Sequence, residues 1–264
     1  MPSALASASS RSVFSPAKSS ALGLIAEIQT RQQFEDLKQK AFAASQSGQF
    51  EAADGYWSEL LEAFPDSAPL WSNRGNIRVS QNRLEAAIAD YDKAVEFAPN
   101  SADPYINRGA ALEGLGRWQE AIADYNQALQ FEPDSAALYN NRGNAKGGQG
   151  DWEGAIADYQ EAAKLMPNFA LARVNTALAL YQVGEVEPSI QRLRGLVRKY
   201  PRFADVRAAL TAMLWATGRR GEAESNWYAV MGLDTRYKDI DWVRQIRRWP
   251  PAVADALDQF LTLS

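Results

Sequence analysis

The chain has 264 residues, of which 46% are hydrophobic and 23% charged, and its formal net charge at pH 7 is −4. This composition is typical of a folded protein, and the negative charge gives no general attraction for nucleic acids or anionic lipids. The sequence contains no Cys and no His, which excludes disulfides, thiolate or histidine metal sites, and catalysis by a cysteine nucleophile or a histidine base. It also contains no apolar run near the roughly 18 residues that a membrane span requires.

Residues 1–26 differ in composition from the rest of the chain. They contain eight Ser together with Arg11 and Lys18, and the first acidic residue is Glu27. A segment that is rich in Ser and Ala, weakly basic and free of acids resembles an organelle transit peptide, in particular a plastid one. The alternative is an ordinary disordered tail. In either case we expect this leader to carry no core, and the helices to begin at about residue 27.

From residue 27 to residue 237 the chain repeats a unit of 34 residues, which is marked by two series of residues. The first series is Pro65, Pro99, Pro133, Pro167 and Pro201. The second is Gly48, Asn82, Gly116, Gly150, Gly184 and Gly218. Between them, apolar residues recur every three or four positions, which predicts helices. Because proline ends a helix and glycine allows the left-handed conformation that closes one, each unit is predicted to be a helix, a turn and a second helix.

Six such units fit the chain, followed by a C-terminal cap. The units are 34–67, 68–101, 102–135, 136–169, 170–203 and 204–237. The first, fifth and sixth depart most from the common pattern, as expected where a unit meets solvent or a cap. Within residues 238–264, the segments 239–247 and 253–261 are predicted as two short helices that cover the last open face.

The recurring residues of these units resemble tetratricopeptide repeats. An aromatic residue and a glycine lie on the first helix, and two alanines flank another aromatic residue on the second. In unit 102–135 these residues are Tyr105, Gly109, Ala121, Tyr125 and Ala128. Small residues let the two helices approach closely, and the aromatic residues fill the space against the next unit. The resemblance implies an all-α fold, a right-handed solenoid of paired antiparallel helices, whose first helices line a concave groove that binds segments of other proteins.

Charged residues also recur with the unit. One position of the first helix holds Arg74, Arg108 and Arg142, and one position of the second holds Asp90, Asp124 and Asp158. Packed helices lie about 10 Å apart, so either series alone would place like charges in a row. We interpret the two series as ion pairs that set the angle between units. The alternative is a stripe of arginines that binds anions.

Asparagines on the first helices are candidates for binding a partner, because side-chain amides can bond the backbone of an extended peptide. One series repeats with the unit and could equally bond the neighbouring helix: Asn73, Asn107, Asn141 and Asn175. Asn76, Asn140 and Asn144 lie outside that series and are the better candidates. Toward the C terminus the same helices carry Leu178, Tyr181 and Trp215, which either anchor an apolar part of the partner or support the cap.

The resemblance also implies a test for one binding mode, in which Lys and Asn from three units hold a terminal carboxylate. Lys38 fits, but Phe42 replaces a required Asn, and Asp103 and Asn107 replace two cations. Without these cations nothing neutralises the carboxylate, so we do not expect this mode. The predicted partner-binding residues are Lys38, Phe42, Asn76, Asn107, Asn140, Asn144, Leu178, Tyr181 and Trp215.

Basic residues cluster near the C terminus beside two tryptophans. Arg244, Arg247 and Arg248 with Trp242 and Trp249 could contact anionic lipid or a partner. The alternative is a solvated helix face next to core tryptophans.

We find no unique catalytic constellation, since the acidic residues recur with the unit as scaffold features do. We therefore expect a monomeric, non-catalytic scaffold without metal or cofactor, which binds an extended peptide or helix of another protein. The leader, and an ending Arg-Arg-Trp-Pro-Pro similar to that of cyanobacterial and plastid repeat proteins, imply a chloroplast protein. This protein would assist assembly or maintenance of a photosynthetic complex, with peripheral association at the thylakoid. The alternative is a soluble adaptor of the stroma or cytoplasm that recruits an enzyme or signalling protein.

Overall fold

The computed structural model describes residues 21–263, with side chains from residue 31 onward. Within these residues all regular structure is helical. The helices are α1 (Ala21–Gln46), α2 (Phe50–Ala63), α3 (Ala68–Ser80), α4 (Leu84–Phe97), α5 (Ala102–Gly114), α6 (Trp118–Phe131), α7 (Ala136–Gln149), α8 (Trp152–Leu165), α9 (Ala170–Gln182), α10 (Val186–Lys199), α11 (Ala204–Ala216), α12 (Arg220–Met231), the 3₁₀ helix η1 (Thr235–Lys238), α13 (Ile240–Gln245) and α14 (Pro251–Leu263).

The N-terminal helix starts earlier than the composition predicted. Helix α1 begins at Ala21, so the last residues of the predicted leader, 21–26, are helical and continuous with the first unit. The helix extends into the Ser-rich segment because Ala and Leu, which begin it, are strong helix formers. The prediction of a transit peptide concerns mainly residues 1–20, which lie outside the described residues.

Each unit is a pair of helices joined by a tight turn. In the third unit α5 ends at Gly114, Gly116 has a φ of 72°, and α6 begins at Trp118. Such a left-handed residue reverses the chain direction, so the paired helices lie side by side and antiparallel. At the far end of the unit α6 ends at Phe131, shortly before Pro133. The two series of residues in the sequence therefore mark the turns and the helix ends as predicted.

A small residue on one helix and an aromatic ring on the other bring the two helices of a unit together. Tyr125 of α6 is fully buried, and a Cβ atom at Gly109 of α5 would lie only 2.9 Å from its ring. Real side chains essentially never approach so closely, so the ring can pass only where the first helix has glycine. Gly75 with Tyr91 and Gly143 with Tyr159 repeat this arrangement in the neighbouring units.

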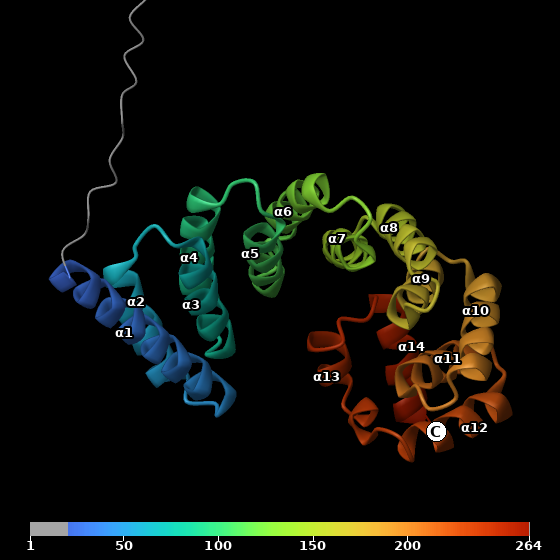
Figure 1. The fold of residues 1–264 in the computed structure, drawn as a ribbon. Coiled ribbons are helices and arrows are strands. Elements are labelled where there is room, and N and C mark those ends of the chain that lie inside the picture. Colours follow the sequence, from blue (N-terminus) through green and yellow to red (C-terminus); the bar gives the residue numbers. More distant parts are fainter. Residues whose placement is uncertain (1–20, 264) are drawn as a thin grey trace, which may run out of the picture.

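The pairs stack in chain order into a curved array (Figure 1), in which α6, α8 and α10 lie on the outer side and α5, α7 and α9 on the inner side. Helices α13 and α14 turn back toward the inner side, and α14 packs against α11 and α9. Leu257 and Phe260 of α14 are fully buried and share one hydrophobic cluster with Leu178 and Met213. The predicted fold class is thus confirmed as an all-α solenoid of paired helices with a C-terminal cap.

Candidate functional site

A cavity of about 1060 Å³, which we call the inner cavity, lies between the concave side of the array and the segment 244–251, which runs from the end of α13 to the start of α14. Helices α5, α7 and α9 provide one wall, and residues 244–251 provide the opposite wall. Trp118 and Trp152 line it, together with the exposed side chains of Leu171 and Ile246. The cavity therefore combines polar groups with apolar surface that is accessible from outside.

Three asparagines form a hydrogen-bonded network on the wall of the inner cavity. Asn175 of α9 donates its amide to Oδ1 of Asn140 at 3.0 Å and to Oδ1 of Asn144 at 3.3 Å. Tyr159 of α8 donates its hydroxyl to the same Oδ1 of Asn144 at 3.0 Å. These bonds use the two carbonyl oxygens, and within the described residues no partner is found for the NH₂ groups of Asn140 and Asn144. The network thus holds two amide donors at the cavity wall.

The repeat explains how a tyrosine of a second helix reaches this inner surface. The ring of Tyr159 crosses α7 over Gly143, and its hydroxyl emerges beside Asn144. Burial raises the pKa of Tyr159 above its ordinary value, so the phenol stays protonated and remains a donor. In the second unit Tyr91 bonds Asn76 in the same way at 2.7 Å, outside the inner cavity.

In the third unit the same tyrosine position meets an acid instead of an amide. Tyr125 donates its hydroxyl to Glu113 of α5 at 3.0 Å, and Glu113 also pairs with Arg248 at 3.3 Å. Burial raises the pKa of the Glu113 carboxyl, although these two partners act in the opposite direction. Arg248 has a φ of 51°, which is uncommon for a residue other than glycine, and its guanidinium lies 5.9 Å from the ring centre of Trp118. The ion pair joins the C-terminal segment to the third unit across the concave face.

Sequence reasoning missed Glu113, although a signal was present. Glu113 lies at the position that Tyr181 and Trp215 occupy in later units, and both of those residues were candidates because they are large and apolar. A comparison of this position across all units would also have found the acid.

A buried carboxylate anchors the C-terminal segment. Asp205 of α11 is 2% exposed and accepts two bonds from Arg247, at 3.0 and 2.6 Å. The hydroxyl of Tyr237 donates to it at 2.5 Å, and the indole nitrogen of Trp249 at 3.3 Å. Burial and the charge of Asp205 raise the pKa of Tyr237, which keeps this donor protonated. The carboxylate of Asp205 therefore fixes the position of residues 247–249. In this position Arg248 faces Glu113.

The structure brings only some of the predicted binding residues together. Asn140, Asn144 and Leu178 line the inner cavity. Lys38 and Phe42 lie on α1, where Phe42 packs its edge against Trp57, and Asn76 and Asn107 lie on α3 and α5. A binding role for these upstream residues stays a prediction. The basic cluster is paired within the protein: Arg244 contacts Asp255 and Asp258, while Arg247 and Arg248 contact Asp205 and Glu113.

The apolar residues that were predicted to anchor a partner pack mainly against the C-terminal cap. Leu178 is only 3% exposed, and Trp215 packs edge to face on Phe260 with ring centres 5.2 Å apart. Tyr181 is half-buried and packs against the same core cluster. The reason is that α14 folds onto α9 and α11 and covers this surface. These residues therefore support the cap, which was the alternative reading of their apolar character.

The recurring charges pair within each unit and also reach the preceding one. Arg108 contacts Asp124 of its own unit and Asp92 of the preceding unit, in both cases at 2.7 Å. The equivalent bonds are Arg74 to Asp90 and Ser58, and Arg142 to Asp158 and Asn126. The hydrogen bond to Asp124 raises the pKa of Arg108, so this charge is permanent. We call these contacts the ladder; each of its arginines ties together three helices.

In the described part of the chain, neither a metal-binding group nor a membrane-spanning helix is found. Within residues 21–263 no group of three or more acidic side chains could hold a metal ion. None of the helices in that range is both long and apolar enough to cross a bilayer.

Three stretches of the sequence, 75–116, 114–150 and 148–184, match the family model described as TPR repeat. No curated protein matches the sequence. Similar solved structures include a tetratricopeptide repeat protein from Parabacteroides merdae, with a TM-score of 0.72, 18% identity, and coverage of 88% of this chain and 93% of that one. A MamA protein has a TM-score of 0.59 and 20% identity, with 64% of this chain and 92% of that one covered.

A further similar structure is YrrB, described as a TPR protein with an unusual peptide-binding site. It has a TM-score of 0.54 and 21% identity, and the match covers 67% of this chain and 92% of that one. At such identities the likeness shows the fold alone. The chain therefore carries TPR repeats over residues 75–184, within a helical solenoid of the kind that TPR proteins form.

Proposed function

We propose that the protein is a non-catalytic scaffold that binds an extended segment of a partner protein in the inner cavity. The observation that carries this proposal is the amide network, which holds the NH₂ groups of Asn140 and Asn144 at the cavity wall. Backbone carbonyls of an extended peptide are matching acceptors and are the same for every peptide sequence. The network therefore suits recognition of a main chain.

The size and charge of the inner cavity favour a short, largely neutral segment. Its volume of about 1060 Å³ is slightly above the range for small-molecule pockets, about 300–1,000 Å³. The basic side chains around it are already paired with acids of the same chain, so they offer no free charge. Apolar side chains of the segment can pack on Trp118, Trp152 and Ile246, which supply aromatic and aliphatic surface. The peptide-binding site described for YrrB, a protein of similar fold, supports this mode.

We also propose that the scaffold assists assembly or maintenance of a photosynthetic complex at the chloroplast thylakoid. The support is the composition of residues 1–26, which resembles that of a plastid transit peptide, and the sequence Arg-Arg-Trp-Pro-Pro at residues 247–251, which is similar to that of cyanobacterial and plastid repeat proteins. Fractionation tests this step. Recovery with thylakoid membranes and release by salt or alkali would support it, whereas a soluble complex with an enzyme would favour a regulatory adaptor instead.

A pair of matched variants tests the inner cavity. Peptides that bind the full chain are first selected from a random library, and their affinities are then measured with each variant by isothermal titration. Asn140→Ala with Asn144→Ala removes two hydrogen bonds, each worth about 0.5–1.5 kcal/mol, so we expect affinity to fall about tenfold. Asn126→Ala is the control because Asn126 also bonds within the array, to Arg142, but lies outside the cavity.

The control separates the binding site from general effects on the array. We expect Asn126→Ala to change affinity less than about twofold. If the cavity variant binds the peptides as tightly as the wild type, the inner cavity is not the binding site. Equal losses for both variants would assign the effect to a general change of the array, and would also contradict the proposal.

A further inference from the structure

The ladder stops at the fifth unit. In the units before it, each arginine reaches from a first helix to the second helices of two successive units, as Arg142 does with Asp158 and Asn126. One repeat later, Thr176 stands at the position of Arg142. Arg192 and Gln160 stand at the positions of Asp158 and Asn126. The arginine is thus replaced by a threonine, and the aspartate by an arginine, so the charge at the acceptor position is reversed.

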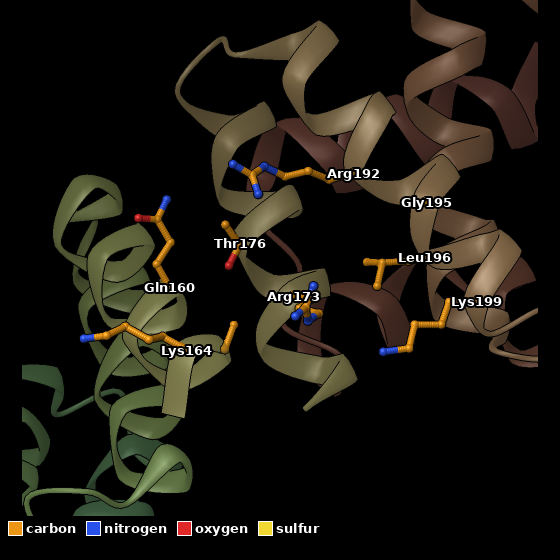
Figure 2. A pocket seen from close by; sticks show the side chains of 9 residues that line it. Gln160, Lys164, Arg173, Thr176, Arg192, Gly195, Leu196 and Lys199 are labelled. Atoms are coloured by element: carbon orange, nitrogen blue, oxygen red, sulfur yellow. The ribbon is translucent and has the colours of Figure 1, made fainter. Parts of the chain in front are cut away.

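This replacement leaves a cavity. Thr176 is buried, and its hydroxyl donates to the carbonyl of Ala172 in its own helix at 2.8 Å, so it does not reach across to α8 or α10. A cavity of about 440 Å³ lies between α8 and α10 with α9 beneath it, and Gln160, Thr176 and Arg192 line it (Figure 2). We call it the outer cavity, because α8 and α10 lie on the outer side of the array (Figure 1).

The outer cavity is lined by cations and by no acidic residue. The four cationic residues come from three helices and are Lys164, Arg173, Arg192 and Lys199. Arg173 donates to the backbone carbonyl of Pro167, and Lys199 to the amide oxygen of Asn168, each at 3.0 Å. Lys164 pairs with Glu161, which does not line the cavity, and no acid within residues 31–263 pairs with the other three. In a chain of net charge −4, this is a local excess of positive charge.

We propose that the outer cavity binds a phosphate group. Cations that share one cavity repel each other, and an anion between them relieves that repulsion. The guanidinium groups of Arg173 and Arg192 can each present two parallel donors, which match the oxygens of an oxyanion. A phosphate carries nearly two negative charges at pH 7 and three acceptor oxygens, so it neutralises more of this charge than a carboxylate. This binding is separate from peptide binding in the inner cavity, since the two cavities share no lining residue.

Titration of the full chain with inorganic phosphate at constant ionic strength tests the proposal. We expect saturable binding, weakened at least about fivefold by Arg192→Gln and by Lys199→Gln, because each removes a charge-assisted hydrogen bond. Arg198→Gln is the matched control, since Arg198 is an exposed cation of the same helix that does not line the cavity. We expect it to change affinity less than about twofold. Absence of saturable binding, or an equal loss in the control, would overturn the proposal.

A second variant rebuilds the missing step of the ladder. Thr176→Arg together with Arg192→Asp restores the pair found in the preceding units, fills the outer cavity and reverses a charge in it. We expect the variant to stay folded by circular dichroism and to lose phosphate binding. Phosphate binding retained by this folded variant would show that the phosphate lies elsewhere.

Peptides distinguish the source of the phosphate. A phosphoserine peptide that binds more tightly than inorganic phosphate would assign the site to a phosphorylated protein segment, and equal affinity would assign it to a free phosphate compound. The same peptide with Glu in place of phosphoserine is the control. If the Glu peptide binds as tightly, the site recognises carboxylates and the phosphate assignment is wrong.

Discussion

Replacing Asp205 should release the C-terminal segment from the array. Asp205 is 2% exposed and accepts bonds from Arg247, Tyr237 and Trp249, so Asp205→Ala leaves three donors without their acceptor. Removing one partner of a buried ion pair costs about 3–5 kcal/mol. With a urea dependence of about 2 kcal/mol/M, the unfolding midpoint of the cap should fall by about 2 M. Because Trp249 is buried at this contact, its fluorescence should shift to the red as the cap unfolds.

Two further variants make this prediction specific. Asp255→Ala lies in the same cap but removes only an exposed contact to Arg244, which keeps Asp258 as a partner, so we expect a small effect. Tyr237→Phe removes one of the bonds to Asp205, and its cost should lie between those of the other two variants. Urea denaturation of all three variants, monitored by tryptophan fluorescence, gives the order of their losses in unfolding free energy. If Asp205→Ala costs no more than Asp255→Ala, the segment is not anchored by the buried carboxylate.

Two other contacts give predictions. Gly75→Ala places a Cβ 2.6 Å from the ring of Tyr91 and should destabilise the protein by about 1–3 kcal/mol, whereas Gly55→Ala, in an open part of α2, should stabilise it by about 0.5–1 kcal/mol in urea denaturation. The pKa of Glu113 is raised in the folded state, so protonation of this carboxyl stabilises the folded protein. That stabilisation is complete below the unfolded pKa and is lost as the pH rises through the folded pKa. Glu113→Gln should therefore be at least as stable as the wild type at pH 7, with the difference vanishing toward pH 4, and a variant that is less stable at pH 7 would refute this.

Local residue chemistry made much of the fold predictable. Glycine or asparagine with positive φ is needed where each helix pair turns, and proline follows the second helix in the first five units, so both series in the sequence had direct structural meaning. The pairing of Arg108 with Asp124 was also predicted, because each series alone would place like charges in a row and the opposite series neutralises them. These features depend on contacts within one unit or between adjacent ones.

The inner cavity was only partly predictable, because its second wall comes from residues far along the chain. Trp249-Pro250-Pro251 indicates a break between helices but not the direction in which the chain continues. The contact between Arg248 and Glu113 joins the cap to the third unit, and no periodic pattern connects those two positions. For the same reason the sequence could not decide between a partner and the cap as the cover for Leu178 and Trp215.

One position of the first helix accounts for where the inner cavity lies. In successive units it holds Val79, Glu113, Gly147, Tyr181 and Trp215. Glu113 holds the far end of the segment through Arg248, and Tyr181 and Trp215 fill the space beneath the cap. Between them Gly147 has no side chain, and a Cβ there would lie 2.9 Å from the ring of Trp152. Because large residues on both sides hold the segment away from the array while Gly147 extends no side chain toward it, the open space falls beside Asn140 and Asn144, where a peptide backbone can reach the amide donors.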